Sequence, residues 1–218
     1  MKLQTHKNII LIFAIVLVVA GCGGVNEKFE LQNGDLLFTG SELQNKTIGL
    51  SSAINSVTQT ELQTDYTHMG IVEKDGINIM VIHAEPEKGV CREPLGDFMN
   101  ANGRDVIAVY RLNQEYNYLI PDAIENAKKY IGQPYDFTYL LNDSSQYCSG
   151  LIYRIFDDLF QLNPMTFKNP QTNEFLPFWI EHYKKLNIEI PENIPGCNPN
   201  GMASSNCISR QGYLKNIK

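Results

Sequence analysis

The sequence lacks the features that define several large classes of protein. It contains no internal repeat, no coiled-coil heptad pattern and no low-complexity tract, so nothing in it predicts a fibrous or repetitive architecture. It also lacks an excess of basic residues, since 18 Lys and Arg stand against 24 Asp and Glu, for a net charge of −6. An acidic chain has little attraction for polyanions, and we therefore expect no nucleic-acid partner.

Close pairs of metal ligands are missing as well, because no CxxC or HxxxH spacing occurs. The side chains of His68, His83 and Cys148 are of types that suit zinc, but without such a pair we expect no metal and no other cofactor. Cysteine is sparse, and Cys197 with Cys207 could close a small disulfide loop in an exported protein. The sequence leaves the pairing of its five cysteines open.

A hydrophobic run long enough to span a bilayer as a helix, about 20 residues, is absent too. The longest run, residues 9–20, follows two lysines and fits the core of a secretory signal peptide. Its end, Val19-Ala20-Gly21-Cys22, resembles a lipobox, in which the cysteine receives a diacylglycerol and becomes the new N-terminus. Cys22 is therefore the expected lipidation site.

These features predict three segments: a lipoprotein signal peptide at 1–21, a lipidated tether at 22–28 and one domain at 29–218. The lipid on Cys22 would hold the domain on a membrane of the cell envelope, facing the periplasm or the cell exterior. The alternative is an ordinary or uncleaved signal segment in which Cys22 has no role.

The domain combines strand and helix patterns. Asp75-Gly76 between two apolar runs is a strong hairpin signal, and a helix is expected from 121 to 132 with proline first and glycine last. A second helix begins near Cys148 and carries an apolar stripe that reaches Leu159. Strands are expected at 35–38, 68–73, 77–84 and 106–112. This is an α+β pattern, with an antiparallel sheet or partial barrel packed against helices.

The predicted hairpin brings two histidines together. If residues 75–76 form a two-residue turn, His68 stands directly opposite His83, with Cβ atoms about 5 Å apart. Two imidazoles at that distance can share a proton, and one can orient the other. A three-residue loop would place His83 opposite Thr67 instead.

Cys148 occupies a position that suits a nucleophile. It begins an amphipathic helix, where unpaired backbone N–H groups and the helix dipole favour a thiolate and can also stabilise an oxyanion. The apolar stripe starts at Cys148, so the sulfur is expected to point toward the sheet. Taken singly, such a cysteine is more often a buried core thiol, and a strand histidine is more often structural.

Five short motifs occur in a fixed order, and their combination resembles a known family. They are NGDLLF, THMGIV, VIHA, GQPYD and YCSGL, at residues 33–38, 67–72, 81–84, 132–136 and 147–151. The set resembles the YiiX-like, circularly permuted branch of the NlpC-type papain-fold cysteine peptidases, over about residues 34–160. In unpermuted relatives the cysteine helix precedes the histidine strand, whereas here it follows.

The resemblance implies a triad with Cys148 as nucleophile, His68 as base and His83 as the group that orients His68. Close relatives often have Glu at the third position, which makes Glu85, on the same strand face as His83, an alternative. Relatives also tend to have Glu where this chain has Gly150.

We expect the Cys148 backbone N–H to hold the oxyanion, helped by a tyrosine, either Tyr66 or Tyr147. The implied activity is a membrane-anchored cysteine hydrolase that cleaves an amide or ester through an acyl-enzyme, acting as a monomer.

Three alternatives for the substrate and role stay open. The wider superfamily cleaves cell-wall stem peptides, which an anchored domain would meet. The permuted branch is also associated with acylated or lipid-like substrates, so a lipid amidase, esterase or acyltransferase is the rival. C-terminal aromatic residues could then wall an apolar pocket, although core packing is their commoner use: Phe175, Phe178, Trp179 and Tyr183. A lipoprotein that only binds through the same cleft is the third possibility.

Overall fold

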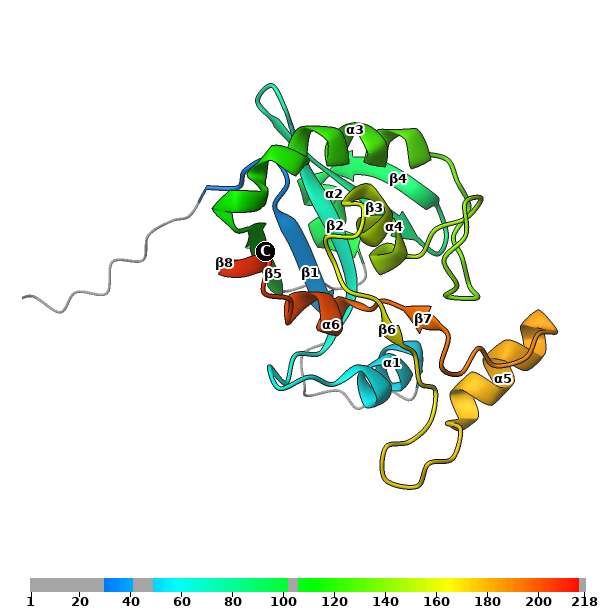
Figure 1. The fold of residues 1–218 in the computed structure, drawn as a ribbon. Helices are drawn as coiled ribbons and strands as arrows, with labels where there is room; N and C mark the ends of the chain where they lie inside the picture. The colour runs from blue at the N-terminus through cyan, green and yellow to red at the C-terminus, as the bar shows by residue number, and fades with distance from the viewer. Residues whose placement is uncertain (1–29, 41–48, 102–105, 216–218) are drawn as a thin grey trace, which may run out of the picture.

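The computed structural model describes residues 30–40, 49–101 and 106–215 (Figure 1). The predicted signal peptide, Cys22 and the tether up to residue 28 lie outside these ranges, so their assignment stays a prediction. Within the described ranges, no helix is both long enough and apolar enough to cross a membrane.

Six antiparallel strands form the central sheet, in the order β4-β3-β2-β1-β5-β8. They are β1 (Leu36–Gly40), β2 (Tyr66–Asp75), β3 (Asn78–Glu85), β4 (Gly89–Pro94), β5 (Val106–Leu112) and β8 (Ile208–Lys215). Strands β1, β2, β3 and β5 lie where the sequence predicts strands, whereas the edge strands β4 and β8 were not predicted. A small second sheet pairs β6 (Asn163–Pro164) with β7 (Pro195–Gly196).

The helices confirm the α+β prediction. They are α1 (Leu50–Thr58), α2 (Leu95–Asn100), the 3-10 helix η2 (Gln114–Leu119), α3 (Ile120–Tyr130), α4 (Cys148–Ile155), α5 (Pro177–Leu186) and α6 (Pro199–Ala203). Helix α4 begins at Cys148 as predicted, but it ends before Leu159 because Asp157 and Asp158 adopt positive φ angles of 39° and 60°.

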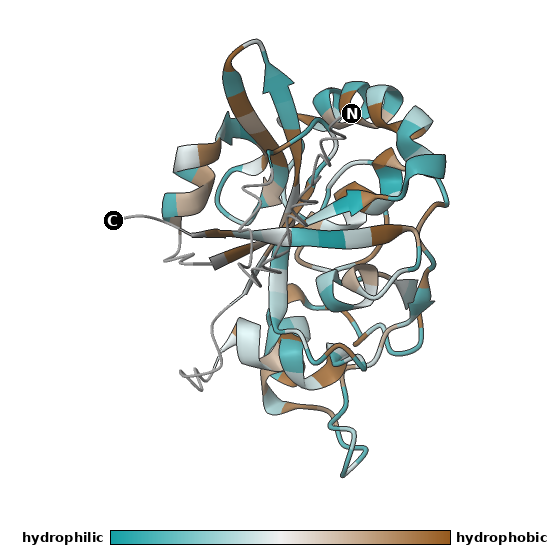
Figure 2. Ribbon diagram, turned by 90° about the vertical axis from the view of Figure 1, so that its left-hand side faces the viewer, coloured by the Kyte–Doolittle hydropathy of each residue, from teal (hydrophilic) through white to brown (hydrophobic). Residues whose placement is uncertain are grey.

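The two faces of the sheet bury different clusters of side chains. On one face, Phe38, Met69 and Ile82 pack with the apolar residues of α3 and α4. On the other face, Leu37 and other strand residues pack around Phe98 of α2. Apolar residues recur along the strands, and α3 carries its polar residues on the outer side (Figure 2). Because strand side chains alternate between faces, the pairing of the strands decides which face each residue reaches.

The turn between β2 and β3 differs from the predicted one. Asp75 pairs with Asn78, so the two turn residues are Gly76 and Ile77. Gly76 has a φ of 62° at the first central position, as a type II′ turn requires. The glycine therefore sits one position earlier in the turn than we predicted, and the pairing of the two strands shifts with it.

This shift corrects one prediction about the site. His83 faces Gly70, and the expectation that it stands directly opposite His68 is wrong. His68 instead pairs with Thr39 of β1 and lies two residues from Gly70 on the same face of β2.

Candidate active site

His68 and His83 meet along a diagonal of the sheet. Nε2 of His68 lies 2.9 Å from Nδ1 of His83, and the Phe98 ring of α2 packs on both imidazoles. Gly70 leaves the room for this contact, because a Cβ there would lie 3.0 Å from Cβ of His83 and 2.8 Å from Cγ1 of Val81. The glycine of the THMG motif thus allows two imidazoles to bond without standing directly opposite.

An acidic residue that the sequence did not point to holds His83 from its other side. Nε2 of His83 lies 3.0 Å from Oε1 of Glu93 on β4, and Lys88 donates to Oε2 of Glu93 at 2.6 Å. Burial tends to raise the pKa of Glu93, but Lys88 and His83 outweigh it and hold this pKa below its usual value. Glu93 is therefore a carboxylate that accepts from His83.

Glu85, the alternative orienting group, lies near both histidines. Its Oε2 is 3.7 Å from Nδ1 of His83 and 3.9 Å from Nε2 of His68. These separations suit an ion pair but exceed a hydrogen bond. The structure therefore brings Glu85 to the histidine pair without giving it the contact that Glu93 makes.

Cys148 is the first residue of α4 and is 5% exposed. Tyr147 precedes it in an extended conformation and starts the helix by accepting from the N–H of Leu151 at 2.9 Å. The N–H groups of the first turn have no partner within the helix, which gives this end its positive character. The four cysteines of the described ranges form no disulfide with one another, so the possible Cys197–Cys207 link is not made.

A β-bulge in β2 lies next to His68, and its extra residue lines the same pocket as Cys148. The body of α4 packs on the face of the sheet opposite to the two imidazoles. The pairing of β1 with β2 slips between His68 and Tyr66, which makes Thr67 an extra residue in β2. Thr67 and Cys148 line the same pocket. The candidate nucleophile therefore shares a cavity with the residue that precedes the candidate base.

The GQPYD motif places another tyrosine beside the thiol. Tyr135 forms an isolated parallel bridge with Gln146, two residues before Cys148. Burial chiefly raises the pKa of Tyr135, and negative charges at Cys148 and Glu85 raise it further. Tyr135 therefore keeps its proton and can donate a hydrogen bond. The sequence offered a signal for it, since it belongs to a motif, but no reason to prefer it over other tyrosines.

The two predicted oxyanion tyrosines have different surroundings. Tyr66 packs on the rings of Phe38 and Tyr110 and does not line the pocket at Cys148. Tyr147 does line the pocket, and its hydroxyl lies 3.4 Å from Sγ of Cys197.

Gly150 accommodates the Tyr147 ring, because a Cβ there would lie 2.6 Å from Cε1 of Tyr147. The glycine that replaces the glutamate of relatives thus lets the Tyr147 ring lie across the first turn of α4.

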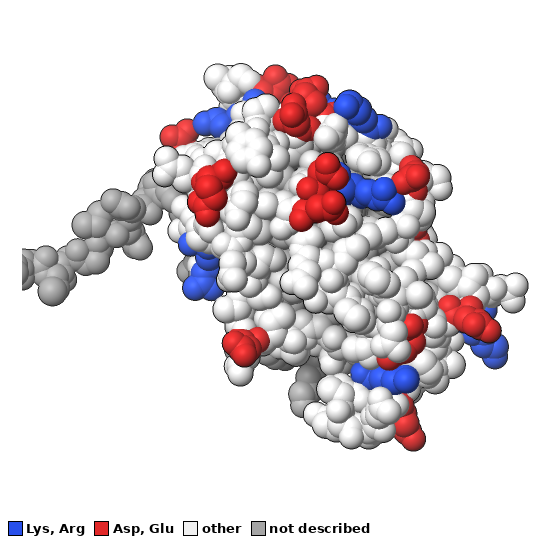
Figure 3. Space-filling model, in the orientation of Figure 1, with Lys and Arg blue, Asp and Glu red and all other residues white. Residues whose placement is uncertain are grey.

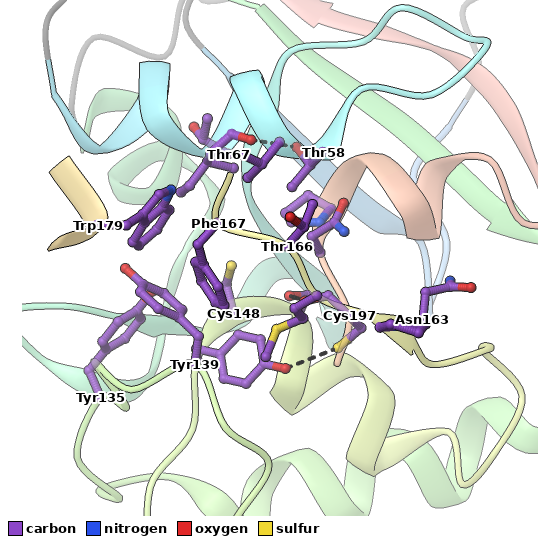
Figure 4. A pocket seen from close by; sticks show the side chains of 18 residues that line it. Thr58, Thr67, Tyr135, Tyr139, Cys148, Asn163, Thr166, Phe167, Trp179 and Cys197 are labelled. Carbon is purple, nitrogen blue, oxygen red and sulfur yellow. Dashed lines mark hydrogen bonds between the residues drawn. The ribbon is translucent and has the colours of Figure 1, made fainter. Parts of the chain in front are cut away.

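The pocket at Cys148 is largely apolar (Figure 4). None of its described lining residues is an acidic or basic side chain. Aromatic rings form much of its wall: Tyr135, Tyr139, Tyr147, Phe167 and Trp179. Its volume of about 110 Å³ exceeds the 10–15 Å³ or so that one water needs, so a group of several atoms fits. Of the four C-terminal aromatic residues named from the sequence, Trp179 lines the pocket, whereas Tyr183 is buried in the core beside it.

One face of the molecule has a large uncharged area between its groups of charged side chains. On the face drawn in Figure 3, charged side chains gather around α3 and near α5, and much of the surface between them is uncharged.

Comparison with known proteins identifies the family. A family model described as "Permuted papain-like amidase enzyme, YaeF/YiiX, C92 family" matches residues 30–210. The chain belongs to this family. It is therefore a papain-like cysteine amidase with a permuted order of elements, and the predicted fold and enzyme class are confirmed.

Two relatives illustrate how far the similarity extends. The uncharacterized protein YiiX of Escherichia coli K12 is 25% identical over 212 residues, which cover 86% of this chain and 88% of the relative. A crystal structure described as that of the metalloprotein YiiX from Escherichia coli O157:H7 has a TM-score of 0.66 at 22% identity, covering 86% of this chain and 99% of the other. At that identity the likeness establishes the fold.

Proposed function

We propose that Cys148 is the nucleophile of this amidase and that His68 is its base. The observation that carries the proposal is the position of Cys148 at the start of α4, in one pocket with Thr67, the neighbour of His68. A helix start favours a thiolate over a thiol. His68 would hold that thiolate as an ion pair, with His83 as the group that orients it.

The hydrogen-bond network indicates which nitrogen of His68 takes the proton. Because Glu93 accepts from Nε2–H of His83, the Nδ1 atom of His83 is an acceptor. It receives Nε2–H of His68 across 2.9 Å. The atom of His68 that accepts the thiol proton is then Nδ1, and we assign both tautomers from this network.

The reaction proceeds in two halves. The Cys148 thiolate attacks the carbonyl carbon of an amide, and the oxyanion is held by the Cys148 backbone N–H and the Tyr135 hydroxyl. His68 gives its proton to the leaving amine, which departs and leaves a thioester on Cys148. Water then loses a proton to His68 and attacks the thioester, which releases the acid and restores the starting enzyme.

The pocket favours an acylated substrate over a cell-wall stem peptide. Stem peptides carry free carboxylates and amines, and the described walls of the pocket hold no charged partner for them. An apolar acyl group, by contrast, would be buried among aromatic rings. The indole N–H of Trp179 is buried and has no hydrogen-bond partner among the described residues, so an oxygen or nitrogen on the acyl group could accept from it. We therefore propose an N-acyl amide or acyl ester as substrate.

Membrane anchoring remains part of the proposal. A lipid on Cys22 would hold the domain at a membrane, where acylated substrates are concentrated. Intact mass spectrometry of the protein purified from membranes should show a chain that begins at Cys22 with added acyl mass. A mature chain that begins elsewhere and has no acyl mass would remove the anchor from the account.

The Cys148→Ala variant tests the catalytic assignment. Hydrolysis of N-acyl amides should fall to background, and the acyl-enzyme adduct seen by mass spectrometry in the unmodified protein should disappear. Cys207→Ala, at a buried cysteine that does not line the pocket, is the matched control and should keep both. Turnover in Cys148→Ala would refute the assignment, and cleavage of muropeptides alone would overturn the substrate class. A protein that binds acylated ligands without turnover would be a binding lipoprotein instead.

A further inference from the structure

A second set of potential ligand atoms lies on the side of His83 that faces away from His68. Cys91 is directly opposite His83 across the β3–β4 pair, and Glu93 follows two residues later on the same face. Sγ of Cys91 lies 3.4 Å from Nε2 of His83, and Oε1 of Glu93 lies 3.0 Å from that nitrogen. One thiol, one imidazole and one carboxylate thus converge on a single point.

We infer that His83, Cys91 and Glu93 form a binding site for a zinc-like divalent cation. In a tetrahedral zinc site, bond lengths of about 2.0 Å to N or O and 2.3 Å to S place the S and N ligands about 3.5 Å apart and the N and O ligands about 3.3 Å apart. The observed separations of 3.4 Å and 3.0 Å are within a few tenths of an ångström of these values. The ligands are therefore close to the required geometry before any ion binds.

The surroundings also suit a metal. Lys88 donates to Oε2 of Glu93 at 2.6 Å, which leaves Oε1 directed at His83 and gives the ligating carboxylate the outer hydrogen bond that such ligands have. His83 is fully buried, but Cys91 is only partly buried on an edge strand, which gives an ion a route from solvent. The sequence shows no close ligand pair because His83 meets the other two only across the sheet.

Binding would change the proton network of the proposed catalytic pair. The cation takes the place of the proton on Nε2 of His83 and of the thiol proton of Cys91, and both protons go to solvent. Nδ1 of His83, which carried no proton, then takes the proton from Nε2 of His68 across their 2.9 Å contact, so that His83 becomes the donor and Nε2 of His68 the acceptor. His68 takes a proton from solvent on Nδ1 in exchange, and Nδ1 is the atom that accepts from Cys148 in the proposed mechanism. The cation is therefore an inhibitor, and this part of the inference rests on the proposed function.

Cobalt(II) absorption tests the site without reference to activity. Titrating the Cys148→Ala protein with Co²⁺ should give one equivalent of a species with a thiolate-to-cobalt charge-transfer band in the near ultraviolet. Cys91→Ser in that background should abolish the band and weaken zinc binding more than about tenfold, whereas Cys207→Ser should keep the band. A band that is absent, or that survives Cys91→Ser, would overturn the site.

Inhibition provides the second readout and separates the two proposals. Zn²⁺ should inhibit the unmodified enzyme reversibly, with recovery on adding a chelator, and Cys91→Ser should be inhibited more than about tenfold less relative to its own basal rate. Cobalt binding in a protein whose Cys148→Ala variant stays active would refute the proposed nucleophile and keep the metal site. Cobalt binding without inhibition of an active enzyme would overturn the coupling.

Discussion

The orientation of the candidate base depends on residues that lie behind it. His68 bonds to His83, His83 bonds to Glu93, and Glu93 bonds to Lys88, with separations of 2.9, 3.0 and 2.6 Å. Each contact fixes the direction of the next hydrogen bond, so a charge on β4 determines which nitrogen of His68 donates to His83 and which one accepts a proton in the proposed mechanism.

Replacing the negative charge in this chain should alter the pH profile of the enzyme. Glu93→Gln keeps the size of the side chain but stabilises an imidazolium less, so kcat/KM should fall about 10- to 100-fold and the alkaline limb should move to lower pH. Measured pH–rate profiles check this, with Glu93→Asp as a partial rescue. Glu87→Gln, an exposed acidic residue on the same β3–β4 connection, is the control and should leave the profile in place. An unchanged pH–rate profile in Glu93→Gln would mean that Glu93 contributes packing alone and that its charge does not act on the histidines.

At the residue scale, the sequence singled out the two histidines that bond to each other and the cysteine at the start of α4, but not their outer partners. His68, His83 and Cys148 stand in motifs, which makes them visible. Glu93 belongs to GVCREP, a short edge strand without apolar alternation, and nothing local marks its carboxylate as a partner of His83. Tyr135 was within a motif, but its closeness to the thiol results from a bridge to Gln146 that a sequence does not reveal.

At the scale of elements, the β2–β3 hairpin combines a correct prediction with a wrong pairing. The Asp-Gly signal marked the hairpin, but the glycine took the first rather than the second central position of the turn, and every cross-strand pair moved. The two imidazoles still bond because Gly70 removes the side chain that would otherwise stand between their strands. Diagonal pairs of long side chains tolerate such a shift.

Adding one methyl group at this position should therefore damage both the hairpin and the site. A Cβ at Gly70 would lie 2.8 Å from Cγ1 of Val81, so Gly70→Ala should cost about 1–3 kcal/mol in the free energy of unfolding and lower the rate of acyl hydrolysis. Urea unfolding and steady-state kinetics measure the two effects. Gly96→Ala, in α2 where an added Cβ meets no atom of the described residues within 4 Å, should be neutral or stabilising. A Gly70→Ala protein with unchanged stability and rate would contradict the packing argument.

At the scale of the whole molecule, one carboxylate connects three elements. Glu73 of β2 bonds to Arg92 of β4 at 2.6 Å and to Lys128 of α3 at 2.8 Å. Burial tends to raise the pKa of Glu73, but the two cations outweigh it and lower this pKa. Its stabilising effect is therefore present above the unfolded-state pKa of about 4.3 and is lost as the pH falls through the lower folded-state value.

Removing the charge of Glu73 should make the protein less sensitive to acid. Glu73→Gln should lower the free energy of unfolding by about 1–2 kcal/mol at pH 7, and the difference from the unmodified protein should shrink below about pH 4. Denaturation curves across this pH range provide the measurement. Glu125→Gln, which removes a more exposed partner of Lys128, should have a smaller effect. If the two proteins still differ in the free energy of unfolding at low pH, the loss of stability in Glu73→Gln comes from changed packing and not from the missing charge.

The overall fold was predictable to the extent that each element carries its own pattern. The four inner strands and the helices at 121 and 148 have apolar periodicity or clear end signals, and they appear close to where they were expected. The edge strands β4 (GVCREP) and β8 (ISRQGYLK) lack a regular apolar alternation, so their pairing depends on neighbours rather than on local sequence. The aromatic pocket combines segments from across the chain, which no local pattern contains.

The ionisation of Cys148 shows whether His68 acts as its base. Thiolate absorbance and the rate of alkylation can be followed against pH in a protein that lacks Cys91, Cys197 and Cys207, and in the same protein with His68→Ala. We expect a Cys148 thiolate well below pH 8 that depends on His68, with a large loss of alkylation rate at neutral pH in the variant. An alkylation profile that is the same with and without His68 would show that His68 is not the base of Cys148.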